Sequence, residues 1–541
     1  MTEKKYIMPR RIIEACGVEN TDQLYKNREL QLISSSAVNL NDDFLVIKKG
    51  GYILLDFGVE LCGGIEMAVQ TIGTDIAAPK CRVVFGESVT EARSTIGEKN
   101  SGNNHTIRDM LIDVVSLGTF RYGDTGFRFV KLEAVNADLY IKTVKAVCDI
   151  ESFEYIGDFE CNDPVINEIW KTGAYTVELC THDYIWDGVK RDRLVWIGDM
   201  HPEVSTISAV FGNLPAIKNS LNLAKNTTPD NQWMNNAASY SMWWIIINYD
   251  YFMHWGDYKY LAEQKFYLMK LCENIIEWAD SGFEGPSNEM KGFVDWSSKY
   301  TESEMEGRWA IGCMSLECAI KIFGYLQNDE YAKKCSKCLE ELLKQKPQHE
   351  TNKSVSALTV LSGRDAHYAK KVLAGSLPKD MSCFMGYYVL KAKAKLGEWE
   401  ESLELIKKYW GEMLKVGATT FWEEFDVAWL ENSGAIDALT PKDKKDIHGD
   451  FGKFCYEQLR LSLCHGWASG PTPYLMEQIG GIEILEPGCK SLRISPKLAG
   501  LEWIRVVYPT PYGKVKVFAT KTKNGVETIV DAPEVINIIK N

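Results

Sequence analysis

The first 155 residues carry short segments of β-branched and aromatic residues, separated by glycine-rich turns. Segments of this length and composition predict β-strands. The strands that we expect are residues 52–57, 66–71, 81–85 and 127–132. Several short strands with turn signals between them predict an antiparallel β-sandwich.

Between about residues 160 and 480 the pattern changes to helical segments, many strongly apolar and aromatic, joined by short loops. The expected helices are 163–180, 203–225, 237–255, 258–280, 308–325, 328–346, 366–375, 380–396, 399–415, 450–463 and 471–479. Helices in tandem without a fixed sequence repeat favour six helical hairpins closed into an (α/α)6 toroid over an open solenoid. The connecting loops of such a ring gather at one end, where a cleft forms.

Short strands return after residue 481, at 482–485, 491–494, 503–508, 514–518 and 527–530. The expected architecture is therefore mainly α with β domains. We predict an N-terminal β-sandwich over 1–155, the toroid over 156–480 and a small C-terminal β domain over 481–541.

Composition narrows the classes of partner. A net charge of −13, without a Lys/Arg cluster interleaved with aromatic residues, disfavours nucleic acid or a membrane surface as partner. The first residues lack the apolar core of a secretory signal, and fifteen scattered cysteines are typical of reduced thiols. These features predict a cytoplasmic protein that acts on a small molecule, and they leave a homodimer open.

Four polar and aromatic clusters fall in the expected toroid loops, and each contains tryptophan beside a carboxylate or a histidine. They are Asp187–Asp199, Gly292–Trp296, Gly417–Glu424 and Ser462–Trp467. The first is unusually dense, with three carboxylates and three cations in thirteen residues. Aromatic planes pack well against sugar rings, and carboxylates accept hydrogen bonds from sugar hydroxyls. Core packing is the alternative for any single tryptophan.

Glycoside hydrolysis needs two carboxyl groups, one that protonates the leaving oxygen and one that activates water or attacks the sugar. The sequences DGVKRDRLVWIGD (187–199), GATTFWE (417–423) and SLCHGW (462–467) resemble motifs of the α-L-rhamnosidases of glycoside hydrolase family 78. The resemblance extends to LDFG (55–58), FGE (85–87) and GFRF (126–129). It implies the three predicted domains and hydrolysis with inversion.

The same resemblance implies roles for individual residues. Asp187 and Asp199 match carboxylates that hold rhamnose hydroxyls, and Glu423 matches the general base, with its neighbour Glu424 as a rival. Further substrate-binding candidates are Arg191, Trp196, Asp295, Trp296, Trp422, His465 and Trp467, with a purely structural role as the alternative for Asp295 and His465. Three residues flank the first motif without an argument of their own: Asp183, His201 and Glu203.

The chain departs from the family pattern at the general acid. Many members read Arg-Asp-Glu-Arg with the glutamate as acid, whereas Arg191-Asp192-Arg193 lacks it, so Asp192 becomes the candidate. A general acid must hold a proton near neutral pH, and a neighbouring guanidinium would lower its pKa. We therefore expect Arg191 and Arg193 to point away from Asp192, and Asp192 to face Asp187 and Asp199.

These observations predict an inverting α-L-rhamnosidase that acts on small rhamnosides, with Asp192 as general acid and Glu423 as general base. No cluster shows metal-ligand spacing, so neither a metal nor a cofactor is expected. Two alternatives stay open. One is a carbohydrate-binding protein that has lost catalysis together with the family glutamate, and the other is an (α/α)6 enzyme for another deoxy or uronic sugar.

Overall fold

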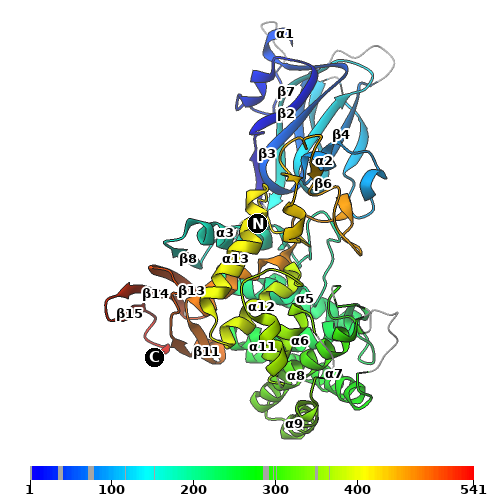
Figure 1. The fold of residues 1–541 in the computed structure, drawn as a ribbon. Helices are drawn as coiled ribbons and strands as arrows, with labels where there is room; N and C mark the ends of the chain where they lie inside the picture. The colour runs from blue at the N-terminus through cyan, green and yellow to red at the C-terminus, as the bar shows by residue number, and fades with distance from the viewer. Residues whose placement is uncertain are drawn as a thin grey trace.

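The computed structural model describes residues 3–33, 40–70, 78–115, 117–150, 153–283, 292–296, 298–299, 301–347, 351–364 and 366–540. Three regions follow one another along the chain. Figure 1 shows N-terminal strands in blue at the top, helices in green and yellow below them, and C-terminal strands in red at one side. The mainly helical fold with β domains at both ends is confirmed.

A seven-stranded sheet forms the N-terminal region, in the order β1-β7-β3-β6-β4-β5, with β2 paired to β3. Two predicted strands, 52–57 and 66–71, lie in the single long strand β3, except Thr71, which is outside the described residues. β3 pairs antiparallel with β6 and parallel with β7, and its register shifts between Asp56 and Leu61. The strands are β1 (Glu3–Ile7), β2 (Arg11–Glu19), β3 (Leu45–Gln70), β4 (Lys80–Gly86), β5 (Asp109–Asp113), β6 (Leu117–Ala134) and β7 (Leu139–Ile150).

The helical region follows the predicted pattern closely at some positions. The helices are α3 (Pro164–Cys180), α4 (Met200–Val210), α5 (Pro215–Thr227), α6 (Ala238–Trp255), α7 (Tyr258–Asp280), α8 (Glu302–Tyr325), α9 (Asp329–Lys344), α10 (Lys353–Leu361), α11 (His367–Leu373), α12 (Cys383–Lys395), α13 (Trp399–Lys415) and α14 (Pro471–Tyr474). Their apolar faces meet in one large core. The predicted bounds of α7 and α13 are those observed.

Two helix predictions were wrong in part or whole, and one helix was missed. The segment 203–225 is two helices, because Gly212 takes a positive φ of 93° and Pro215 starts a new helix. The segment 450–463 holds only one short 3-10 turn, η6 (Gln458–Arg460), since Gly452 and Phe454 both have positive φ. The nine-residue helix α10 was not predicted.

The C-terminal region contains two small sheets, β11-β12-β16 and β15-β14-β13-β8. Its strands are β11 (Ile482–Glu486), β12 (Ser491–Ile494), β13 (Trp503–Thr510), β14 (Gly513–Thr522), β15 (Gly525–Asp531) and β16 (Asn537–Lys540). β8 (Asp158–Cys161) immediately precedes the first toroid helix and pairs antiparallel with β13, with Cys161 opposite Ile504. This pairing fastens the start of the helical region to the end of the chain. The boundaries 1–155, 156–480 and 481–541 stay predictions.

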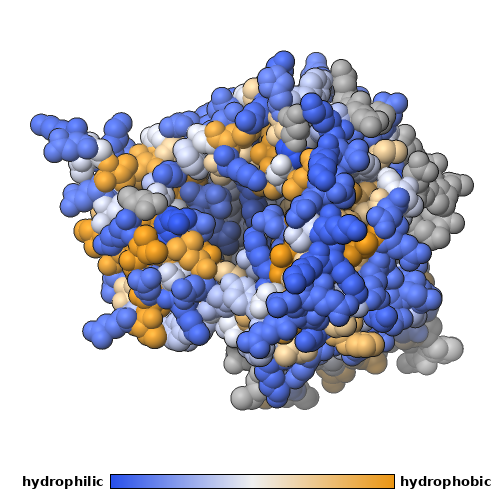
Figure 2. Space-filling view, turned by 90° about the horizontal axis from the view of Figure 1, so that it is seen from below, coloured by the Kyte–Doolittle hydropathy of each residue, from blue (hydrophilic) through white to orange (hydrophobic). Residues whose placement is uncertain are grey.

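A cavity of about 640 Å³ lies toward the C-terminal ends of α4 and α6, beside the C-terminal strands. Charged side chains, among them Asp250, Lys391 and Glu477, line it. Figure 2 shows the molecule from below, where the surface is largely hydrophilic and is hollowed. Among the described residues, no helix is both long and apolar enough to cross a membrane.

Candidate active site

The segment Asp187–Asp199 is a compact loop between α3 and α4, as its sequence predicted. Gly188 forms an isolated β-bridge with His465, which joins this loop to the one that follows η6. A Cβ atom at Gly188 would lie 2.5 Å from the carbonyl oxygen of Arg191, so the turn requires glycine. The backbone N–H of Gly466 donates to the carbonyl oxygen of Asp187 at 2.8 Å. Two segments far apart in sequence therefore meet at this point.

The Asp187 carboxylate organises its own loop. Its Oδ2 accepts the backbone N–H of Asp192 at 2.8 Å, and its Oδ1 accepts that of Leu194 at 2.9 Å. Burial raises the pKa of Asp187 to about 7, against the lowering effect of these two hydrogen bonds, and the charges of Asp192 and Glu423 add to the rise. Near neutral pH this carboxyl group can either donate to a sugar hydroxyl or accept from one.

Asp199 lies at the start of α4 and is held from α6. The Tyr240 hydroxyl donates to Asp199 Oδ1 at 2.8 Å, and the Tyr240 ring stands edge-on to Trp196 with the ring centroids 6.0 Å apart. Burial, together with the nearby charge of Asp187, raises the pKa of Asp199 well above its ordinary value.

His465 connects the three buried carboxylates. Its Nε2 lies 3.7 Å from Asp187, 3.9 Å from Asp199 and 3.8 Å from Glu423. Burial lowers the pKa of His465 well below its ordinary value, and the Arg191 charge contributes to that lowering. A neutral imidazole from one motif therefore lies among carboxyl groups that come from two others.

Glu423 is the most firmly held of these carboxylates. Arg191 Nη2 donates to its Oε1, and the backbone N–H of Ser462 donates to its Oε2 at 3.1 Å. The Trp467 indole N–H donates to the Glu423 carbonyl oxygen at 2.9 Å. A guanidinium and a backbone amide both favour the ionised form of a carboxyl group. The arrangement suits a group that must accept a proton.

Its rival Glu424 lies in different surroundings. One Glu424 oxygen accepts the backbone N–H of Phe425 at 3.1 Å. Burial raises the pKa of Glu424 well above its ordinary value, and the Asp295 charge adds to the rise. Asp295 is itself buried and accepts a hydrogen bond from the Ser382 hydroxyl at 3.2 Å. Adjacent glutamates are thus held differently, Glu423 by a cation and Glu424 beside another acid.

Asp192 is more exposed to solvent than Glu423, the other predicted catalytic residue. Its side chain is 21% exposed, compared with 6% for Glu423. His105 Nδ1 lies 3.2 Å from Asp192 Oδ1, and Arg191 Nη1 lies 3.7 Å from the same atom. The contact with Asp187 is made by the backbone of Asp192 rather than by its side chain.

The two arginines of the motif differ in orientation. Arg193 points away from Asp192, as expected: it donates to Asp124, with its guanidinium 4.4 Å from the Trp186 ring centroid. We expected Arg191 to point away from Asp192. Its hydrogen bond does go to Glu423, but its Nη1 atom lies close to Asp192.

The predicted aromatic residues divide into two groups. Trp467 lies against His465 at 4.4 Å between ring centroids and stacks on Phe384, and Trp296 is only partly buried. Trp422 is fully buried and packs edge-on against Phe425. The structure therefore brings Trp196 and Trp467 to the carboxylates and places the Trp422 ring in the core.

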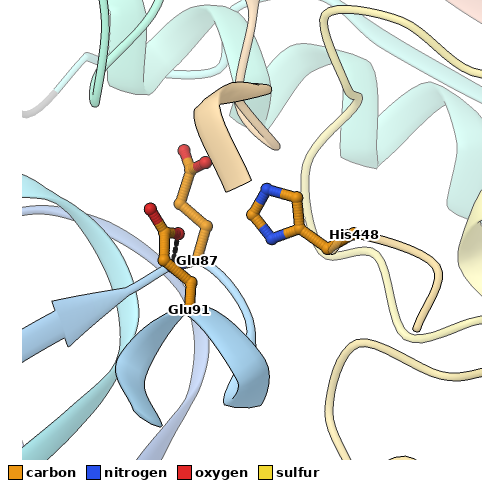
Figure 3. A group of neighbouring side chains, drawn as sticks. All are labelled: Glu87, Glu91 and His448. Atoms are coloured by element: carbon orange, nitrogen blue, oxygen red, sulfur yellow. Dashed lines mark hydrogen bonds between the residues drawn. The ribbon is translucent and has the colours of Figure 1, made fainter. Parts of the chain in front are cut away.

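An ion cluster from the N-terminal region braces these loops. Lys190 Nζ lies 2.9 Å from Glu87 and 3.1 Å from Glu91, and Glu87 also accepts the backbone N–H of Leu463 at 2.7 Å. Figure 3 shows Glu87 and Glu91 converging with His448, a grouping with the spacing of metal ligands. The Lys190 ammonium already supplies a cation to both carboxylates. Both His448 ring nitrogens also have partners, Ser88 and the Leu461 carbonyl. These contacts fit an internal ion cluster better than a metal centre.

Three polar residues of the site were not predicted. Tyr240 lies in an apolar helix that looked like core, and His105 is an isolated histidine in a loop of the N-terminal region. Glu203 was noticed without an argument. Among the described residues its two carboxylate oxygens are buried without a hydrogen-bond partner, and burial raises its pKa well above the ordinary value. The sequence around these three residues contains no pattern that would identify them as part of the site.

Two families match parts of the chain. Residues 154–340 match the family described as bacterial alpha-L-rhamnosidase 6 hairpin glycosidase domain, and residues 481–537 match the bacterial alpha-L-rhamnosidase C-terminal domain. An alpha-L-rhamnosidase of Formosa agariphila is 29% identical over 157 residues, which are 28% of this chain and 16% of that protein.

Solved structures share the fold at low sequence identity. The family 78 rhamnosidase of Bacillus sp. GL1 is 16% identical with a TM-score of 0.72, over 91% of this chain and 53% of that one. A rhamnosidase from Klebsiella oxytoca, solved with rhamnose bound, is 19% identical with a TM-score of 0.70, over 88% and 96% respectively.

The chain covers 16% of the Formosa protein and about half of the Bacillus one. The two matched domains and the shared fold agree with the motifs singled out from the sequence. Residues 154–340 and 481–537 are therefore similar to the six-hairpin glycosidase domain and the C-terminal domain of the bacterial α-L-rhamnosidases, which confirms the resemblance that the motifs indicated.

Proposed function

We propose that this protein is an inverting α-L-rhamnosidase that releases terminal rhamnose from small rhamnosides. One observation carries the proposal. Arg191 lies against both predicted catalytic carboxylates, with Glu423 on one terminal nitrogen and Asp192 near the other. One guanidinium therefore lies near both of the carboxyl groups that hydrolysis requires.

The environments support a division of roles between them. Asp192 is accessible enough to meet a leaving group that extends toward solvent, so it protonates the glycosidic oxygen as the bond to the sugar breaks. Glu423 is held in place by the Arg191 guanidinium and accepts a proton from the water that attacks the anomeric carbon. The product is rhamnose of the opposite anomeric configuration.

The buried groups hold the sugar. Asp187 and Asp199 lie around the neutral His465, and their raised pKa values let them donate as well as accept hydrogen bonds. Trp196 and Trp467 provide apolar surface beside these polar groups, the combination that sugar rings need. The predicted contacts of Arg191, Asp295 and Trp296 with substrate belong to the same proposal, whereas the Trp422 ring packs in the core.

Proton NMR during hydrolysis of a synthetic α-L-rhamnoside tests activity and stereochemistry together. We expect the β-anomer of rhamnose to form first and the α-anomer to appear later by mutarotation. First formation of the α-anomer would overturn the inverting mechanism. Hydrolysis only of aryl glycosides of another sugar would overturn the substrate. Calorimetric binding of rhamnose with no turnover would show a carbohydrate-binding protein.

A further inference from the structure

His105 reaches the site from the N-terminal region. It lies in the loop before β5, which Asn103 ties together by accepting the backbone N–H groups of Arg108 and Asp109 at 3.0 and 3.1 Å. The neighbouring Thr106 hydroxyl lies 3.3 Å from the carbonyl oxygen of Lys190, which it approaches as a donor. The loop is thus fastened on both sides of His105, and one attachment is to the segment that carries Asp192.

The contact falls on an atom of Asp192 that needs a partner. Among the described residues, Asp192 Oδ1 is buried and makes no hydrogen bond. His105 Nδ1 lies 3.2 Å away, without the geometry of a hydrogen bond. Arg191 Nη1 is farther, at 3.7 Å, and that guanidinium is engaged by Glu423. His105 is therefore the side chain placed to satisfy this oxygen.

Charges of both signs face the His105 ring. Asp192 and Glu423 favour its protonated form, while Arg191 and Arg460 oppose it. Burial is the largest influence and lowers the pKa of His105 below its ordinary value. A neutral imidazole beside a carboxyl group can accept the carboxyl proton and return it, so such a pair titrates as a unit.

We propose that His105 and Asp192 share the proton that Asp192 delivers to the leaving group. This rests on the proposed function. Asp192 gives the proton to the glycosidic oxygen, the bond from that oxygen to the anomeric carbon breaks, and Glu423 takes the proton of the attacking water. Glu423 then releases its proton to solvent, and the pair regains one proton from solvent, to which the His105 side chain is 25% exposed. His105 is a positioning residue that acts through Asp192.

A shared proton would explain how Asp192 can act as the acid in a motif that lacks the family glutamate. A lone aspartate ionises near pH 4, which leaves little acid form at neutral pH. A pair that shares one proton retains it to higher pH, since the imidazole also holds it. Asp192 can then serve as the acid although Arg191 lies nearby.

The first test is the pH dependence of kcat/KM in His105→Gln, measured with an alkyl rhamnoside and with an activated aryl rhamnoside. For the alkyl substrate we expect the basic limb to move down by about one pH unit, which is about a tenfold loss on that limb. The activated substrate needs little protonation, so its rate stays within a few-fold. An unmoved basic limb, or equal losses on both substrates, would overturn the proposal.

A matched control is His367→Gln, which removes an exposed histidine on α11. It should leave both pH profiles unchanged. If His105→Gln does not fold, His105→Asn replaces it with a smaller side chain that also cannot carry the proton, and the same limb is measured.

A second readout does not depend on turnover. NMR of ring-labelled histidine gives the pKa of His105 in the wild type and in Asp192→Asn. We expect that pKa to fall in the variant, because the carboxylate that stabilises the imidazolium is gone. An unchanged His105 pKa would overturn the shared proton. If the wild type hydrolyses no rhamnoside, the proposed function fails while this measurement still reports on the pair.

Discussion

The two sides of the site differ in their access to water. On one side Asp192 is 21% exposed and meets His105 from the N-terminal region. On the other side Glu423, Asp187 and Asp199 are almost fully buried around His465. A carboxyl group that must be reprotonated in each turnover benefits from contact with solvent. Carboxyl groups that orient a substrate benefit from a dry, fixed environment, where hydrogen bonds are strongest.

Arg191 lies between the accessible side, with Asp192, and the buried side, with Glu423. It is buried, hydrogen-bonded to Glu423 and 3.7 Å from Asp192. On the accessible side a second group that can hold a proton, His105, lies beside Asp192. The comparison therefore predicts that the two sides respond differently to substitution.

Glu423→Gln should have the largest effect. Loss of a general base costs about 10²- to 10⁴-fold in kcat, and the substitution also leaves Arg191 buried without its anionic partner. We expect a loss near 10³-fold together with a lower free energy of unfolding, measured by steady-state kinetics and urea titration.

Glu424→Gln is the matched control for Glu423. Burial raises the pKa of Glu424 well above its ordinary value, which favours the protonated carboxyl group, and an amide resembles that form closely. We expect only a few-fold loss of activity. Equal, mild losses in the two variants would contradict the assignment of Glu423 as base.

Asp192→Asn should separate the accessible side from the buried one. We expect the fold to be intact and turnover of unactivated rhamnosides to fall by about 10²-fold or more. Rates on activated aryl rhamnosides should fall much less, because such leaving groups depart without a proton. Rates like those of the wild type on unactivated substrates would remove Asp192 as the acid.

Asp187 tests the buried side through pH. Its folded-state pKa is about 7, while an unfolded aspartate has a pKa of about 3.9. Because the folded value is raised, its contribution to stability is fully present below pH 4 and is lost as the pH rises toward 7. The free energy of unfolding of the wild type should therefore fall, relative to Asp187→Asn, by about 1.4 kcal/mol per pH unit within that window.

Urea titrations of both proteins between pH 4 and pH 7 measure this difference. The amide of Asp187→Asn does not titrate, so any constant cost of the substitution cancels in the comparison. Parallel stability curves would show that Asp187 does not ionise with a raised pKa.

Local sequence predicted what is local in the structure. The bounds of α7 and α13 follow from continuous helical periodicity, and the Asp187–Asp199 loop follows from its two glycines and its charge density. The segment 450–463 was wrongly predicted as a helix. Its apolar residues are buried, but they belong to a loop whose positive φ angles rule out a helix. Periodicity cannot distinguish these two ways of burying the same side chains.

Contacts between distant segments could not be predicted. β8 pairs with β13 more than three hundred residues later, and His105 reaches Asp192 from another region of the chain. The sequence around these residues contains no pattern that predicts either contact. The carboxylates of the site were found because each lies in a motif with tryptophan, whereas Tyr240 resembled its apolar neighbours on α6.

Tyr240→Phe should give a small effect and is the most selective test of the buried side. It removes the hydroxyl that donates to Asp199 at 2.8 Å and keeps the ring against Trp196. A hydrogen bond of this kind contributes about 1 kcal/mol, so we expect up to a tenfold change in kinetics. If Asp199 holds the sugar, the change appears mainly as a higher KM, with kcat nearly kept. A fall in kcat with KM unchanged would instead place Asp199 in the chemical step, beside Glu423.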